Sequence, residues 1–81
     1  MTTHEDIRRR LTEIFQDVLD DRTLELSDAT TALDVEGWDS LTHITLIAAV
    51  EKAFKVSFTT KQVTGFRTVG DLARAIETRV P

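Results

Sequence analysis

The stretch Gly37-Trp38-Asp39-Ser40-Leu41, followed by an apolar run to Phe54, decides how this chain folds. Glycine and aspartate break or cap helices, whereas the residues after them favour a helix. We therefore expect Asp39 to cap a helix over residues 40–54 by accepting hydrogen bonds from amide groups of its first turn. This assignment leaves the Ser40 hydroxyl unused and facing solvent. A phosphate ester on that oxygen would lie at the positive end of the helix dipole.

The apolar residues of this expected helix form two stripes. The stripe expected to face the core consists of Leu46, Val50 and Phe54, with Ile47 and Ala53 alongside. The second stripe begins beside Ser40 and consists of Leu41, Ile44 and Ala48. A helix that is apolar on two faces is either buried or in contact with another molecule. Because a small domain has little core, we expect the second stripe to be partly exposed and available to partners.

The N-terminal segment has the spacing of an amphipathic helix. Thr3 and Asp6 are placed for a capping box, and the apolar residues that follow share one helical face: Ile7, Leu11, Ile14, Phe15, Val18 and Leu19. Three consecutive arginines, 8–10, fan around the helix instead of forming one basic patch. We interpret them as a solvated face that pairs with the acids Glu5, Asp6 and Glu13.

The C-terminal third predicts a short helix and a longer one. Residues 56–58 read as extended chain, after which Thr59 and Gln62 are spaced as a capping box for a short helix that ends near Gly65. Thr68 and Asp71 repeat the box. The last helix carries apolar residues at helical spacing, namely Val69, Leu72, Ala73, Ile76 and Val80.

Residues 20–39 show no clear period. We interpret them as an ordered surface loop with a short turn at 27–31, held by apolar anchors at Leu24, Leu26, Leu33 and Val35. The predicted fold is therefore all-α: a small four-helix bundle of three principal helices plus a short third helix, with a long loop between helices one and two. We expect one domain over residues 1–81.

Composition excludes several classes of function. The chain of 81 residues has no cysteine, so it forms no disulfide, and two histidines make a structural zinc site unexpected. Its net charge of −4 disfavours nucleic-acid binding. No apolar stretch approaches the roughly 20 residues that span a bilayer, and the polar N-terminus does not resemble a signal peptide. We expect a soluble cytoplasmic protein.

Asp39-Ser40-Leu41 resembles the attachment motif of acyl carrier proteins, whose serine bears a 4′-phosphopantetheine arm. The long hydrophobic helix after it and the stretch Phe66-Arg67-Thr68-Val69-Gly70-Asp71-Leu72 extend the resemblance over nearly the whole chain. It implies that a phosphopantetheinyl transferase moves the arm from coenzyme A to Ser40, with Asp39 as motif residue and cap. The arm would then carry acyl groups as thioesters.

The resemblance also implies partners and a docking surface. An acyl-loading enzyme and a ketosynthase or other acyl-processing enzymes would meet a monomeric, non-catalytic carrier that binds neither metal, nucleic acid nor membrane. The docking residues would be Leu41, Ile44, Ala48, Val63 and Phe66. Acyl carriers of fatty-acid synthesis usually have an acidic second helix, whereas here the first acid after Ser40 is Glu51. This departure favours a polyketide-like or hybrid pathway over fatty-acid synthesis, and Asp39 argues against a typical peptidyl carrier.

Other readings of these residues remain open. The chain could instead be an unmodified helical interaction module that uses the second stripe only for docking, or a carrier for fatty-acid or for peptidyl or aminoacyl substrates. Asp39, Ser40 and His43 are close in sequence, but a hydrolase also needs an oxyanion hole and a group that orients the histidine. We interpret His43 as a surface residue near the arm and Trp38 as core. We interpret His4 as part of a polar, frayed terminus in preference to a metal ligand.

Overall fold

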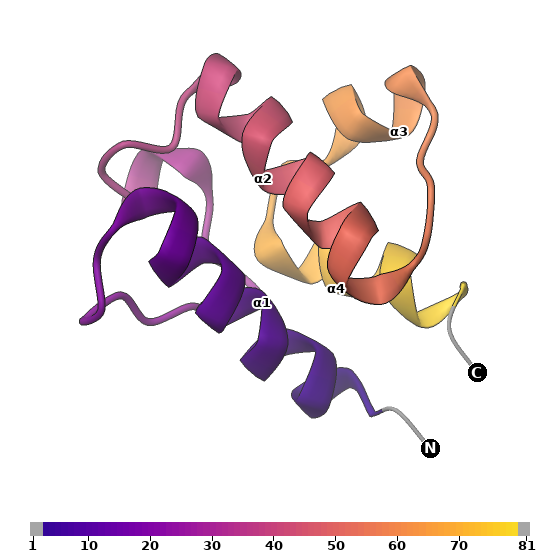
Figure 1. Cartoon of the computed structure of the whole chain (residues 1–81), viewed down its shortest axis with the longest axis horizontal. Coiled ribbons are helices and arrows are strands. Elements are labelled where there is room, and N and C mark those ends of the chain that lie inside the picture. The colour runs from indigo at the N-terminus through magenta and orange to yellow at the C-terminus, as the bar shows by residue number, and fades with distance from the viewer. Residues whose placement is uncertain (1–2, 80–81) are drawn as a thin grey trace.

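The structure is a computed structural model that describes residues 3–79. Its elements are α1 (His4–Leu19), the 3-10 helix η1 (Ala32–Asp34), α2 (Ser40–Phe54), α3 (Thr60–Gly65) and α4 (Val69–Glu77). α1 packs against both α2 and α4, and the short α3 lies beside the first half of α2 (Figure 1). Residues 3–79 contain no strand, only an isolated bridge between Thr31 and Thr68. The predicted all-α four-helix fold is confirmed. Val80, expected at the end of the last helix, lies outside the described residues.

The predicted caps set the helix boundaries. Thr3 Oγ1 accepts from the Asp6 amide at 3.1 Å, so α1 begins at His4. Both halves of the capping boxes at Thr59 and Thr68 are present, at the starts of α3 and α4. Each box satisfies two backbone amides that the first helical turn leaves without partners. These starts depend on residues three apart in sequence, which is why the sequence alone located them.

The core is formed by the predicted faces of the three longer helices. Its fully buried side chains include Ile7, Leu11 and Phe15 of α1, Leu46 and Val50 of α2, and Leu72 and Ile76 of α4. The expectation that Ala53 lies alongside this core was wrong, because Ala53 is exposed. At that end of α2 the side chain reaching across from α1 is Arg10. Its guanidinium donates to the Ala53 carbonyl oxygen at 2.9 Å and lies 4.2 Å from the centre of the Phe54 ring.

The three arginines of α1 therefore have different surroundings. Arg9 forms the expected pair with Asp6 at 3.5 Å. Arg8 instead approaches Asp28 of the loop at 3.9 Å, and Arg10 packs on Phe54 as described. The prediction that all three pair with acids of their own helix was thus only partly correct, since the loop and α2 pass close enough to take two of them.

The loop between α1 and α2 is anchored at most of its expected positions. Leu24 and Leu26 pack partly buried against the core, and Val35 is 6% exposed. The turn is confirmed by the Thr30 amide, which donates to the Ser27 carbonyl at 3.1 Å. Leu33, however, is 98% exposed, so its assignment as an anchor was wrong. In the three-residue turn of η1, side chains two positions apart point to different sides. Val35 points inward, and Leu33 therefore points outward.

Backbone hydrogen bonds join this loop to the start of α4. The Val69 amide donates to the Thr30 carbonyl and the Gly70 amide to the Asp28 carbonyl, each at 2.9 Å. Both amides belong to the first turn of α4 and have no acceptor within the helix. The loop thereby supplies the acceptors that α4 lacks, and α4 fixes the path of the loop toward α2.

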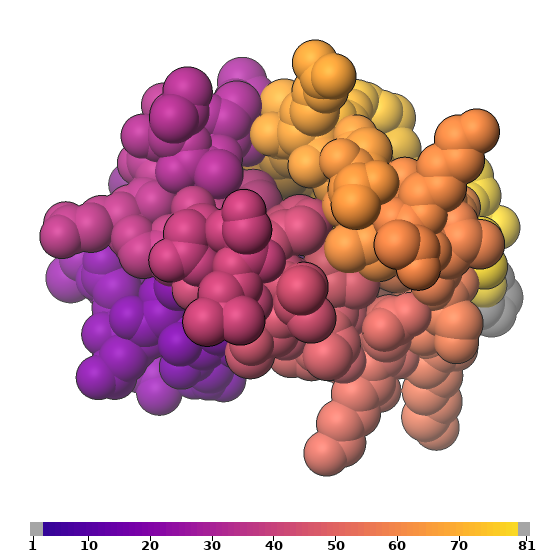
Figure 2. Space-filling model, turned by 90° about the horizontal axis from the view of Figure 1, so that it is seen from above, coloured from indigo at the N-terminus to yellow at the C-terminus, as the bar shows by residue number. Residues whose placement is uncertain are grey.

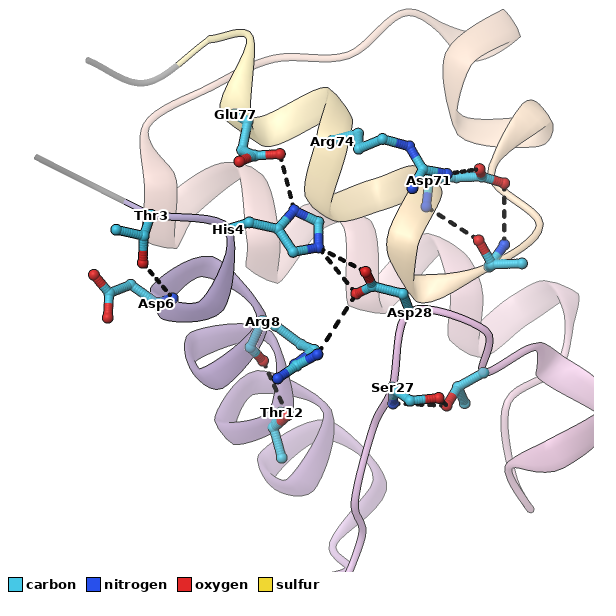
Figure 3. Close-up of polar contacts among 12 residues, drawn as sticks. Thr3, His4, Asp6, Arg8, Thr12, Ser27, Asp28, Asp71, Arg74 and Glu77 are labelled. Carbon is cyan, nitrogen blue, oxygen red and sulfur yellow. Dashed lines mark hydrogen bonds and ion pairs between the residues drawn. The ribbon is translucent and has the colours of Figure 1, made fainter.

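His4 joins the start of α1 to the loop and to α4 (Figure 3). Its Nδ1 lies 2.9 Å from Glu77 Oε2, and its Nε2 lies 2.9 Å from both carboxylate oxygens of Asp28. The hydrogen bonds to Glu77 and then Asp28 raise the pKa of His4 above 6.5, and the bond from His4 lowers the pKa of Asp28. The expectation of a frayed terminus at His4 was wrong, because these contacts hold the residue in place. Its partners lie far away in sequence.

None of the helices described is both long and apolar enough to cross a membrane.

Candidate functional site

Asp39 caps α2 as the sequence predicts. It has an extended backbone, and its Oδ1 accepts from the Thr42 amide at 2.8 Å, while its carbonyl accepts from the His43 amide at 2.8 Å. The hydrogen bond from the Thr42 amide is the largest of the causes that lower the pKa of Asp39. The carboxylate is therefore charged at neutral pH and committed to the helix start.

Ser40 is the first residue of α2 and is exposed to solvent. Within residues 3–79 its hydroxyl takes part in no hydrogen bond to another side chain or to the backbone. Capping by Asp39 makes this possible, because its carboxylate accepts the hydrogen bond that a serine hydroxyl often accepts at a helix start. The predicted outward hydroxyl at the helix start is confirmed. An anion bound to this oxygen would lie at the positive end of the α2 dipole.

An open, mainly apolar groove of about 560 Å³ runs beside Ser40. It lies where the loop, the start of α2 and α3 meet, on the face shown in Figure 2. Its apolar walls are Ala32, Trp38, Ile44, Val63 and Phe66, and its polar lining is Asp39, Ser40, His43, Thr64 and Arg67. A flexible group attached to Ser40 would have this groove directly beside it.

Trp38 and His43 connect the two sides of the groove. Trp38 is 7% exposed and packs edge-on against Phe15 at 5.0 Å between ring centres, so its assignment to the core is confirmed. Its Nε1–H donates to His43 Nδ1 at 3.1 Å, which leaves Nε2–H of the neutral ring to donate to the Val63 carbonyl at 2.9 Å. His43 thus links α2 to α3.

This arrangement corrects part of the interpretation of His43: the residue lies beside Ser40 along the groove, as expected, but it is not a free surface residue. The ring is partly buried, stacked on Trp38 with 6.0 Å between ring centres, and both of its nitrogens have protein partners. Neither nitrogen is therefore placed to take a proton from Ser40, as a serine hydrolase would require. No group of three or more His, Asp or Glu side chains in the described part of the chain is arranged to hold a metal ion.

The residues expected for docking divide into two sets. Leu41 is 77% exposed, Ile44 is 64% exposed and Ala48 is exposed, which confirms that the second stripe of α2 faces solvent. Val63 and Phe66 are half-buried and line the groove. Phe66 also packs edge-on against Phe58 at 5.2 Å.

Sequence reasoning missed the contribution of the loop to this site. Ala32 and Arg67 line the groove, and Leu33 is exposed next to Ala32. A signal was available: Thr31 and Asp34 have the spacing of a capping box, and Asp34 Oδ2 accepts a hydrogen bond from the Thr31 amide at 2.9 Å at the start of η1. That motif places residues 32–34 in a tight turn. The chain is therefore not extended there, and the side chains of Leu33 and Val35 do not both point inward.

Comparisons with known proteins agree with this geometry. The sequence model of a family described as "Phosphopantetheine attachment site" matches residues 9–76, which include Ser40. The solution structure of a holo acyl carrier protein from Geobacter metallireducens superposes with a TM-score of 0.82 at 36% sequence identity, covering 96% of this chain and 85% of that one. None of the curated proteins compared matches. The cofactor is therefore 4′-phosphopantetheine. This chain belongs to the phosphopantetheine attachment site family and has the fold of an acyl carrier protein.

Proposed function

We propose that this chain is an acyl carrier of a polyketide-type pathway, with the 4′-phosphopantetheine arm attached to Ser40 Oγ. The observation that carries the proposal is the Ser40 hydroxyl, which is exposed at the start of α2 while Asp39 provides the cap. We further propose that residues 1–81 act as one carrier domain in the cytoplasm, where coenzyme A is available.

Attachment is a phosphoryl-group transfer from coenzyme A. The Ser40 oxygen forms a bond to the phosphorus that carries pantetheine, and the bond from that phosphorus to the bridging oxygen of the pyrophosphate breaks. Adenosine 3′,5′-bisphosphate leaves, and the hydroxyl proton passes to a base of the transferase. The chain supplies an accessible oxygen and a helix dipole that favours the anionic phosphodiester product. His43 takes no part, because its ring nitrogens are hydrogen-bonded to Trp38 and to the Val63 carbonyl.

The terminal thiol of the attached group holds an acyl chain as a thioester. The remaining task of the protein is tethering, which raises the effective concentration of that chain at the site of each partner enzyme. We place docking on Leu41, Ile44 and Ala48, together with Val63 and Phe66 at the groove. The partners would be the transferase, an acyl-loading enzyme and a ketosynthase or other acyl-processing enzymes, each meeting a monomeric carrier.

The polyketide assignment is supported by the charges on α2. Its first turn has no acid, and its first acidic residue is Glu51, eleven positions after Ser40. A partner that recognises an acidic second helix by a basic patch would therefore find little attraction here. Comparing turnover of the acylated protein by polyketide and fatty-acid ketosynthases tests this point. Efficient use by the fatty-acid enzyme would contradict the assignment to a polyketide pathway.

Intact-mass measurement tests the attachment itself. The purified chain is incubated with coenzyme A and a permissive phosphopantetheinyl transferase, alongside Ser40→Ala and Ser57→Ala variants. Ser57 is a matched control, because it is also an exposed serine. We expect wild type and Ser57→Ala to gain one phosphopantetheine and Ser40→Ala to gain none. No gain by wild type with any transferase would favour an unmodified interaction module.

A further inference from the structure

The exposed large apolar side chains of the described residues all lie close to Ser40 in sequence. They are Leu33, Leu41 and Ile44, at 98%, 77% and 64% exposure. Leu41 and Ile44 follow Ser40 on α2, whereas Leu33 precedes it on η1, next to Ala32 of the groove lining. Isolated exposed leucines are ordinary, but a group that flanks one functional serine in sequence, with Ala32 and Ile44 both lining the groove beside it, indicates a contact surface.

The backbone holds Leu33 in its outward position. Asp34 Oδ2 accepts from the Thr31 amide at 2.9 Å and from the Thr31 hydroxyl at 3.2 Å, and the Asp34 amide donates to the Thr31 carbonyl at 3.0 Å. Val35, which follows the turn, is buried. The backbone that precedes the turn is hydrogen-bonded to the start of α4. Because both ends of the turn are fixed, Leu33 is already in its exposed position before a partner binds. Binding therefore costs little conformational entropy in the loop.

The charge around Leu33 indicates what kind of surface it meets. Every charged side chain from Thr23 to Glu51 is acidic, and the three nearest Ser40 in sequence, Asp34, Glu36 and Asp39, are all exposed. Steering by α2 itself is weak, so attraction at this end of the molecule comes from the loop. A complementary partner has an apolar socket bordered by Lys or Arg.

We infer that Leu33 is an anchor for the phosphopantetheinyl transferase, seated in an apolar socket with a basic rim. This inference rests on the proposed attachment at Ser40. The transferase is the partner that must bring its active site to the Ser40 oxygen itself, whereas later enzymes act on a thiol at the far end of the arm. Cations that meet Asp34 and Glu36 would also neutralise the pyrophosphate of coenzyme A as it approaches the acidic loop.

Steady-state kinetics of the transferase with Leu33 variants test the anchor. Leu33→Ser should raise KM about tenfold and leave kcat within about twofold, because an anchor contributes equally to substrate and transition-state binding. Leu33→Met keeps the apolar contact and should restore the wild-type KM. Both variants should keep the wild-type Tm, since the side chain is almost fully exposed.

Charge variants in the loop of this chain test the basic rim proposed for the transferase socket. Glu36→Gln should raise KM, and the effect should fade as salt increases, whereas Glu13→Gln on the exposed side of α1 removes the same charge without effect. Equal effects of the two variants would contradict a localised basic rim.

The outcomes separate this inference from the proposed function. If wild type is not modified at Ser40, the proposed function fails. If wild type and Leu33→Ser are modified with equal kcat/KM, the proposed function holds and the anchor is overturned. If Leu33→Ser slows only a later acyl-transfer step, or changes self-association instead, Leu33 serves a later enzyme or a second copy of the chain and the assignment to the transferase is overturned.

Discussion

At the residue scale, His43 is a connecting residue between the site and the core. It accepts a hydrogen bond from the buried Trp38 and donates one to the Val63 carbonyl, which joins α2 to α3 along the groove. The single tryptophan reports on this contact, because Trp38 is the only indole in the chain.

We predict that His43→Ala lowers the free energy of unfolding by about 1–3 kcal/mol, since it leaves the Trp38 N–H and the Val63 carbonyl without partners. Trp38 emission should move to longer wavelength as water reaches the indole. Chemical denaturation followed by fluorescence measures both effects. Thr45→Ala, an exposed change on the same helix, is the control and should alter neither. Unchanged emission and stability in His43→Ala would contradict the connecting role.

The sequence predicted residues whose role depends on near neighbours and missed those with distant partners. Asp39 and Ser40 were placed correctly because a helix cap is decided within three residues. His4 was misassigned, and His43 in part, because Asp28, Glu77 and Val63, which they contact, are twenty or more residues away in sequence. Periodicity does not report which distant groups the fold brings together.

At the element scale, the contact between the loop and α4 fixes the segment that leads to Ser40. A side chain at position 70 would put its Cβ 2.9 Å from the Asp28 carbonyl oxygen and 3.0 Å from the Asp28 Cβ. Gly70 is therefore required by the close approach of the loop, not by helix formation. The capping boxes of α3 and α4 were readable from the sequence, whereas this packing of loop on helix was not.

We predict that Gly70→Ala destabilises the protein by about 1–3 kcal/mol through this clash. Helix propensity alone predicts the opposite sign, because alanine in a helix is favoured over glycine by about 1 kcal/mol. Gly65→Ala in α3 is the matched control: its Cβ would have nothing within 4 Å, so Tm should be unchanged or higher. A rise in Tm for both variants would show that the loop does not pack tightly on α4.

At the scale of the whole molecule, His4 ties α1, the loop and α4 into one unit, and this contact depends on pH. The pKa of His4 is raised above 6.5 by Glu77 and Asp28. Its stabilisation is therefore complete below about pH 6.5 and is lost as pH rises through the folded-state pKa. The pKa of Asp28 is lowered from 3.8, so its contribution is present above that value and is lost as pH falls through its folded-state pKa.

We predict that the difference in Tm between wild type and His4→Gln is largest near about pH 5.5 and shrinks toward about pH 9. Thermal unfolding across this range measures it. Glu13→Gln on α1 should give a small difference that does not change over the same range. A His4→Gln difference that stays constant or grows with pH would show that the charged histidine does not hold these elements together.

The arrangement of the helices was predictable in outline, because the apolar faces of 7–19, 40–54 and 69–76 each demand a partner and leave only a helical bundle. The side chain of Leu33 was not, since loops lack the periodicity that assigns inside and outside. Among the exposed large apolar side chains of the described residues, Leu33 is nevertheless the one that lies outside α2.

We propose the Ser40 oxygen as the attachment point, and locating the modification in the chain tests this most directly. The chain treated with coenzyme A and transferase is digested, and the peptides are fragmented in a mass spectrometer. We expect phosphopantetheine on the peptide that contains Ser40, at that residue, with Ser27 and Ser57 unmodified. Phosphopantetheine on any other residue, with Ser40 unchanged, would contradict it.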